Sequence, residues 1–142
     1  MERNLATVVA VGAVALGLAA AWKLSAQDRE RTVREGVYSA AQAARGARLF
    51  ESICTNCHEI TDFTAAGAYL EGVEGQPLWE TFEYVSAEMP EDDPGSLRLA
   101  DYADVLAYIF SVYGLPSGAT DLPLDQDSLE AIMIVRPSPP GS

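Results

Sequence analysis

One short motif in this sequence holds every cysteine and histidine of the chain, residue types that can bond covalently to a cofactor or bind its metal. Cys54-Thr55-Asn56-Cys57-His58 contains both cysteines and the only histidine of the 142 residues. A C-x-x-C-H run is typical of covalent haem attachment, because two thiols three residues apart on a turn can reach the two vinyl groups of one porphyrin. The motif predicts thioether bonds from Cys54 and Cys57 and an iron ligand at His58.

Other uses of a C-x-x-C pair are a disulfide, half of a zinc site and a redox dithiol, and each fits this sequence less well. A structural zinc site usually takes four Cys or His ligands, and the chain has only three such residues. A redox dithiol is expected beside a βαβ unit, whereas the residues on either side of this pair have a helical pattern. We therefore expect one covalently bound haem c as the cofactor.

The iron of such a haem takes a second axial ligand, and few residues qualify. With no second histidine, the candidates are Met1, Met89 and Met133. Met89 stands in a loop rich in turn-forming residues, and Pro90 restricts its backbone to extended geometry. We expect Met89 to be the second ligand; a packing role for Met89, or ligation by Met133, are the alternatives.

Three helices are expected to position these residues. The first spans about 39–54, with Ser39 as a favourable N-cap, and the last spans about 98–113, where apolar residues recur at helical spacing. A short middle helix is expected over 78–86. Gly46 interrupts the first helix, and an isolated glycine in a helix often marks close packing, so we expect it to contact the last helix.

These residues resemble those of class I c-type cytochromes, the small monohaem electron carriers. Gly46 and Phe50 stand eight and four residues before Cys54, like the glycine and aromatic at the helix crossing of that family, and Ala107-Tyr108-Ile109 is similar to its tyrosine segment. The similarity extends over about residues 42–113. It implies an all-α fold, with three main helices around one covalently attached haem.

The resemblance also bears on the ligand set. Met-Pro, followed by Pro-Gly-Ser-Leu and the last helix, is similar to the bacterial short-loop form of the axial methionine segment, which implies His58 and Met89 as the two axial ligands. It further implies that Trp79 could hydrogen-bond a haem propionate, although a core position is the alternative for this residue.

The remaining segments define the expected organisation. Residues 1–24 include an uncharged run of eighteen residues, about 27 Å as a helix. We expect this N-terminal hydrophobic helix to be a transmembrane anchor, with a cleaved signal peptide as the alternative. A charged linker is expected over 25–38, the cytochrome c domain over 39–115 and a C-terminal extension over 116–142. The apolar run of this extension is expected to pack on the domain, with a partner contact as the alternative.

The charge balance limits the class of partner. The formal net charge is -12, and Arg98 is the only cation between Leu49 and Val135. Nucleic acid is therefore an unsuitable partner, and a redox protein with a basic docking face is expected. A quinol-oxidising complex, a terminal oxidase and a photosynthetic reaction centre are the partners that family habit implies.

The function expected from these observations is one-electron transfer rather than enzymatic catalysis. With His58 on iron, no histidine remains for acid–base chemistry. Since c-type haem is attached outside the cytoplasm, we expect the periplasmic side of the bacterial inner membrane, in a respiratory or photosynthetic chain. The alternatives are an electron-accepting subunit of a dehydrogenase and a gas-binding or catalytic haem protein.

Overall fold

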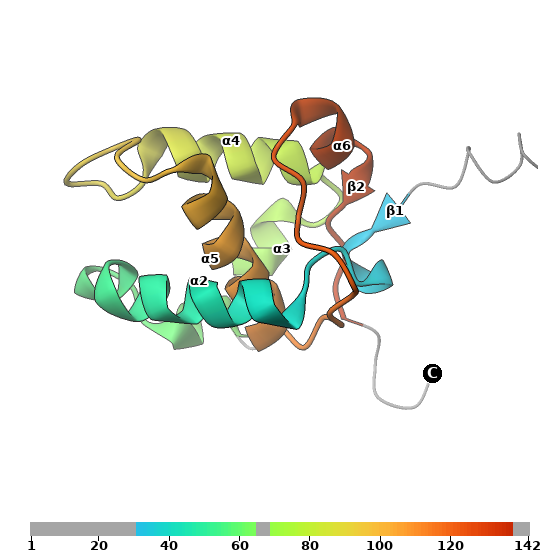
Figure 1. Cartoon of the computed structure of the whole chain (residues 1–142), viewed down its shortest axis with the longest axis horizontal. Coiled ribbons are helices and arrows are strands. Elements are labelled where there is room, and N and C mark those ends of the chain that lie inside the picture. Colours follow the sequence, from blue (N-terminus) through green and yellow to red (C-terminus); the bar gives the residue numbers. More distant parts are fainter. Residues whose placement is uncertain (1–30, 65–68, 138–142) are drawn as a thin grey trace, which may run out of the picture. The chain divides into compact units, whose positions relative to one another are not determined.

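The computed structural model describes residues 31–64 and 69–137, and these residues are mostly helical. The three longest helices within these two ranges are α2 (Ala40–Ser52), α4 (Leu78–Glu88) and α5 (Leu99–Val112). Each occupies a position predicted from the sequence, and the all-α class is confirmed. In Figure 1, α5 lies between α2 and α4.

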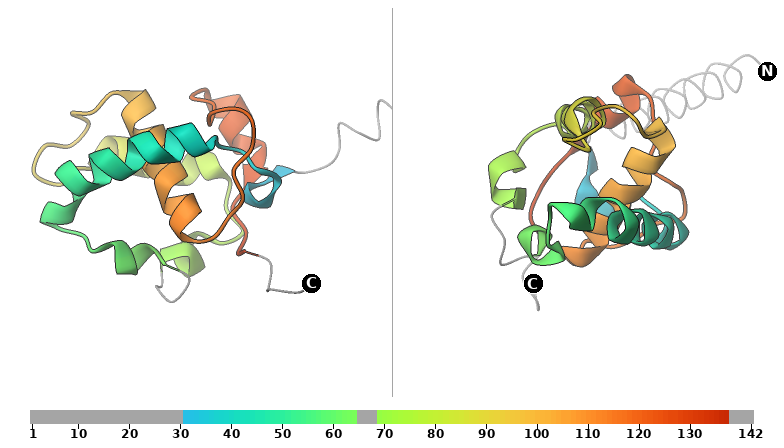
Figure 2. Two further views of the ribbon diagram at one scale, coloured as in Figure 1. Left: turned by 60° about the horizontal axis from the view of Figure 1, so that its bottom comes forward. Right: turned by 90° about the vertical axis from the view of Figure 1, so that its left-hand side faces the viewer.

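Helix α2 begins where the sequence pattern places its cap. The Ser39 hydroxyl accepts a hydrogen bond from the backbone N–H of Gln42 at 3.0 Å, which satisfies one of the unpaired donors at a helix N-terminus. The helix crosses α5 (Figure 2), and Gly46 of α2 lies directly against the α5 backbone at Asp104. A Cβ atom at Gly46 would lie 1.8 Å from the carbonyl oxygen of Asp104, so the predicted close packing is confirmed.

Short elements connect the long helices. The 3₁₀ turns are η1 (Val33–Glu35), η2 (Cys54–Asn56) and η3 (Ile60–Phe63), and the short helices are α3 (Tyr69–Val73) and α6 (Gln126–Glu130). Two-residue strands β1 (Arg31–Thr32) and β2 (Ile132–Met133) pair in parallel, with Arg31 opposite Ile132 and Thr32 opposite Met133. This small sheet joins the beginning of the described chain to its end.

The packed unit begins earlier than the predicted boundary near residue 39. Val33 is fully buried, and Val37 and Tyr38 are each 2% exposed. The Tyr38 hydroxyl donates to the carbonyl oxygen of Leu115 at 2.6 Å. The later part of the predicted linker is therefore core rather than solvated spacer, because β1 and η1 pack against the distant C-terminal segment. Residues 25–30 of that linker lie outside the described residues.

The C-terminal extension packs on the helices, as predicted. Its apolar side chains Leu122, Leu129, Ile132 and Ile134 are almost completely buried. With these side chains covered, the alternative of an apolar contact for a partner loses its basis. The predicted cytochrome domain and its extension thus share one hydrophobic core.

A polar network ties this extension to the helix crossing. The Arg45 guanidinium pairs with the carboxylates of Asp104 at 2.8 Å and Asp121 at 2.7 Å. Asp104 is only 6% exposed, and its ion pair supplies the charge compensation that a buried carboxylate needs. Gln42 adds a buried hydrogen bond, since its side-chain oxygen accepts from the N–H of Leu122 at 2.8 Å. The extension is held by specific contacts as well as by apolar burial.

The structure bears on a membrane-spanning helix only in the part of the chain that it describes. Within residues 31–64 and 69–137, no helix is sufficiently long and apolar to cross a membrane. The predicted hydrophobic helix of residues 1–24 lies outside the described residues.

Candidate functional site

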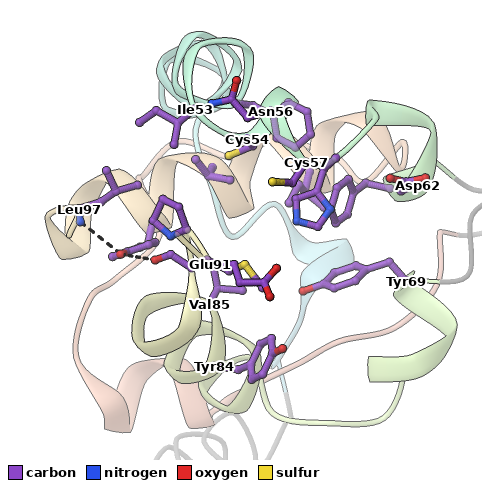
Figure 3. Close-up of a pocket in the computed structure, with 18 of the residues that line it drawn as sticks. Ile53, Cys54, Asn56, Cys57, Asp62, Tyr69, Tyr84, Val85, Glu91 and Leu97 are labelled. Carbon is purple, nitrogen blue, oxygen red and sulfur yellow. Dashed lines mark hydrogen bonds between the residues drawn. The ribbon is translucent and has the colours of Figure 1, made fainter. Parts of the chain in front are cut away.

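A cavity of about 730 Å³ opens between the C-terminal end of α2, the Met89 loop and α5. This volume falls within the range of about 300–1,000 Å³ that is usual for small-molecule and cofactor sites. Its wall brings together four of the five predicted site residues: Cys54, Cys57, His58 and Met89. In Figure 3, Cys54 and Cys57 lie on one side of the cavity, and Tyr84 and Val85 lie on the opposite side.

A tight turn after α2 presents the C-x-x-C-H motif to this cavity. The carbonyl oxygen of Cys54 accepts from the N–H groups of Cys57 at 3.2 Å and His58 at 2.9 Å. Both cysteines are free thiols, Cys54 half-buried and Cys57 exposed. Burial raises the pKa of the Cys54 thiol, which keeps this group protonated at neutral pH. The turn leaves both sulfur atoms available for bonds to a group inside the cavity.

A cluster of aromatic rings packs next to the C-x-x-C-H motif. The Phe63 ring packs edge-on against His58, Phe50 and Tyr69, with ring centroids 5.5, 5.7 and 5.0 Å apart. Phe50 in turn contacts Tyr108 of α5 at 5.6 Å. Such pairs contribute about 0.5–1.5 kcal/mol each beyond their area burial. The cluster connects the motif to α2, α3 and α5, and therefore limits the movement of the His58 ring.

Met89 enters the cavity wall from the end of α4. It is the C-cap residue of this helix, with φ -114° and ψ 149°, so the extended geometry predicted for a residue before proline is confirmed. Its N–H donates to the carbonyl oxygen of Val85 at 3.1 Å. In the following loop, Asp93 donates to the Pro90 carbonyl at 3.0 Å. The first bond holds the Met89 backbone against α4, whereas the second closes a turn within the loop.

Sequence reasoning missed the part that Tyr102 plays at this site. Tyr102, Val105 and Ile109 of α5 all line the cavity, whereas the sequence predicts only that this helix contacts the first one at Gly46. The sequence signal that could have revealed this shared role is their spacing of three and then four residues, because it places all three side chains on one helix face. The Tyr102 hydroxyl also bonds to two points of the Met89 loop, which no local sequence pattern reveals.

Trp79 is not brought to the cavity. Its ring is partly buried against the hydrophobic core and packs on Phe82, with centroids 5.8 Å apart. Both residues lie on α4, whose cavity-facing residues are instead Tyr84 and Val85. The predicted propionate contact therefore has no support from the cavity lining, and the alternative core position describes Trp79 better.

The charged lining of the cavity is entirely acidic among the described residues. Asp62, Glu91 and Asp92 contribute exposed carboxylates, and no Lys or Arg of the described chain belongs to the wall. Tyr69 extends its side chain into the cavity (Figure 3), and burial raises its pKa to about 12, with smaller contributions from Tyr113 and Tyr84. The phenol is therefore a neutral hydrogen-bond donor at physiological pH.

The expectation of a metal-binding site is wrong for the polypeptide acting alone. In residues 31–64 and 69–137, no group of three or more His, Cys, Asp or Glu side chains is placed to hold a metal ion. The motif supplies only two thiols and one imidazole from a single turn, whereas a structural site for a bare ion such as zinc usually needs about four ligands. Any metal here would have to arrive with ligands of its own.

Comparisons of the chain with models of protein families, with curated proteins and with solved structures give no match.

Proposed function

We propose that this chain is a class I c-type cytochrome that transfers single electrons through one haem c. The observation that carries the proposal is the convergence of Cys54, Cys57, His58 and Met89 on a single cavity. In this proposal Cys54 and Cys57 hold the porphyrin by thioether bonds, and His58 and Met89 are the axial ligands of its iron. A porphyrin supplies its own nitrogen ligands, so two axial groups from the chain suffice.

The residues of the cavity suit this group in three respects. Its volume is about 730 Å³, both thiols are free, and a half-buried thiol, an exposed thiol and an imidazole come from one turn. The helix crossing at Gly46, Phe50 and Tyr108 also agrees with the class I resemblance. Together these features support a covalent haem more strongly than a zinc site or a disulfide.

When bound, the haem supplies a one-electron Fe(III)/Fe(II) couple, whose potential a Met/His ligand pair raises. The chain's own part is to keep the surroundings of that couple constant. Part of the cavity wall is apolar and excludes water, and it is formed by Val85, Val105 and Ile109. The aromatic contact with Phe63 restrains the His58 ring. Constant surroundings suit electron transfer, because little needs to move when the charge changes.

The setting of this function follows from charge and from where haem is attached. The acidic groups of the cavity wall, Asp62, Glu91 and Asp92, favour a redox partner with a basic docking face. A quinol-oxidising complex as donor, and a terminal oxidase or reaction centre as acceptor, would fit. The periplasmic side of the inner membrane is the proposed location, since c-type haem is attached outside the cytoplasm.

The proposal is tested by producing the full chain with a haem-attachment system and measuring its spectrum and reduction potential. Haem should remain bound after denaturation of the wild type and should be lost from a Cys54→Ala, Cys57→Ala double variant. Absence of covalent haem in the wild type would overturn the proposal. Ready binding of carbon monoxide by the native reduced protein would instead favour a gas-binding or catalytic haem.

The ligand assignment has its own test. Met89→Leu should abolish the sulfur-to-iron charge-transfer band of the oxidised protein and lower its reduction potential. Met133→Leu is the matched control, because Met133 lies in β2 and is not part of the cavity wall, and it should leave both properties unchanged. Retention of the band in Met89→Leu would refute the assignment.

A further inference from the structure

The Met89 loop is joined to α5 by one buried hydroxyl group. The Tyr102 hydroxyl donates to the carbonyl oxygen of Met89 at 2.7 Å and accepts from the N–H of Leu97 at 3.2 Å (Figure 3). It therefore connects the first residue of the loop to its last part. The Tyr102 side chain is 2% exposed, so water cannot readily replace either bond.

The position of this bridge matters because its three residues all belong to the cavity wall. Met89, Leu97 and Tyr102 line the cavity together with His58. Tyr102 stands on α5, which crosses α2 at Gly46, and α2 leads directly into the C-x-x-C-H turn. The bridge thus fixes the Met89 backbone to the same framework that positions His58.

The rest of the loop is poorly placed to hold Met89 by itself. Residues 91–96 are all exposed, and their backbone hydrogen bonds are local ones, such as that from the Asp93 N–H to the Pro90 carbonyl. Gly95 donates to the Met89 carbonyl only at 3.4 Å, a longer contact than that of the Tyr102 hydroxyl. Apart from the attachment to α4, the Tyr102 bridge is the strongest polar restraint on Met89 among the described residues.

We infer that Tyr102 is a positioning residue for the methionine ligand: its hydroxyl keeps the Met89 loop closed over the cavity and so suppresses exchange of Met89 for external ligands. This inference rests on the proposed function, because it assigns to Met89 the ligand role proposed above. Tyr102 acts through the Met89 backbone.

The test is the affinity of the oxidised, haem-loaded full chain for imidazole, a small ligand that must displace Met89 to bind iron. Tyr102→Phe removes both hydrogen bonds and keeps the ring. The apparent affinity of a site that opens rarely is proportional to the fraction of molecules in which it is open. Loss of the two hydrogen bonds of the Tyr102 hydroxyl raises that fraction at least about tenfold. We therefore expect imidazole to bind at least about tenfold more tightly to the variant, and the charge-transfer band to be lost at a lower temperature.

Tyr38→Phe is the matched control. Tyr38 is equally buried at 2% exposure, and its hydroxyl likewise donates to a backbone carbonyl, that of Leu115, at 2.6 Å. It does not line the cavity. This variant should lower the free energy of unfolding but leave imidazole affinity unchanged. Equal imidazole affinities in both variants and the wild type would overturn the inference.

A measurement on the wild type tests the inference even if Tyr102→Phe does not fold. Saturation with imidazole should release the bridge, so that the Leu97 amide exchanges its hydrogen faster. The Leu70 amide, which donates to the Tyr113 hydroxyl at 2.6 Å, should keep its exchange rate. Unchanged exchange at Leu97 would contradict the inference, whereas a wild type without covalent haem or without the charge-transfer band would contradict the proposed function itself.

Discussion

Tyr69 shows how burial in the cavity wall changes the chemistry of a single residue. Its pKa is raised from the ordinary value of 10.0 to about 12, mainly because burial disfavours the phenolate. A group whose pKa is higher in the folded than in the unfolded state binds its proton more tightly in the folded state. Its contribution to stability is complete below the unfolded pKa and is lost as the pH rises through the folded pKa.

A pH dependence follows for the protein without haem. Between pH about 10 and about 12, Tyr69 should account for a loss of about 2 to 3 kcal/mol in the free energy of unfolding. Urea unfolding of the wild type and of Tyr69→Phe over this range measures that contribution. The free energy of unfolding should fall less steeply with pH in the variant than in the wild type. Part of the fall should remain in the variant, because burial also raises the pKa of Tyr38 and Tyr113. Parallel curves would contradict the assignment.

At the scale of elements, the crossing of α2 and α5 depends on the absence of a side chain at Gly46. A Cβ atom there would come within 1.8 Å of the Asp104 carbonyl oxygen and 3.0 Å of the Tyr108 Cβ. Neither neighbour is the end of a flexible side chain, so the helices themselves would have to separate. Because α2 ends at the C-x-x-C-H turn, such a separation would also displace the cavity wall.

Gly46→Ala should therefore lower the free energy of unfolding by about 3 kcal/mol. Gly72→Ala in α3 provides the matched control, because an added Cβ atom meets nothing within 4 Å. Alanine also has the higher helix propensity, so this control should be neutral or stabilising by up to about 1 kcal/mol. Urea unfolding measures both changes. Similar values for the two variants would show that the crossing tolerates a methyl group.

At the scale of the whole molecule, the segment after α5 completes the core. Leu129 is 1% exposed and Ile134 is fully buried. Ile134 also exchanges backbone hydrogen bonds with the turn before α4, donating to the Gln76 carbonyl and accepting from the Gly75 N–H, each at 2.9 Å. These contacts lie far from the C-x-x-C-H motif in sequence, yet they support α4, the helix that carries Met89.

Two leucines of this segment give a paired prediction. Leu129→Ala should lower the free energy of unfolding by about 2 to 5 kcal/mol, since it leaves a cavity in the core. Leu124 is 41% exposed, and Leu124→Ala should cost less than about 1 kcal/mol. Thermal or urea unfolding of both variants measures the difference. A small loss in Leu129→Ala would mean that the segment packs loosely.

Local interactions explain which features could be predicted from the sequence. The start of α2 follows from its Ser39 cap, and α5 follows from apolar spacing between residues a few positions apart. The extended backbone of Met89 at the end of α4 follows from its neighbour Pro90. The C-x-x-C-H motif is likewise local, since three reactive groups lie within five residues. The all-α class and the close packing at Gly46 were therefore accessible without the structure.

Only the tertiary structure decided the features that depend on distant residues. Val33 enters the core because β1 pairs with β2 about a hundred residues later in the chain. Trp79 packs on Phe82, whereas Tyr102 faces the Met89 loop. Periodicity shows that a helix has an apolar face, but the neighbours of that face are chosen by the packing of the whole chain.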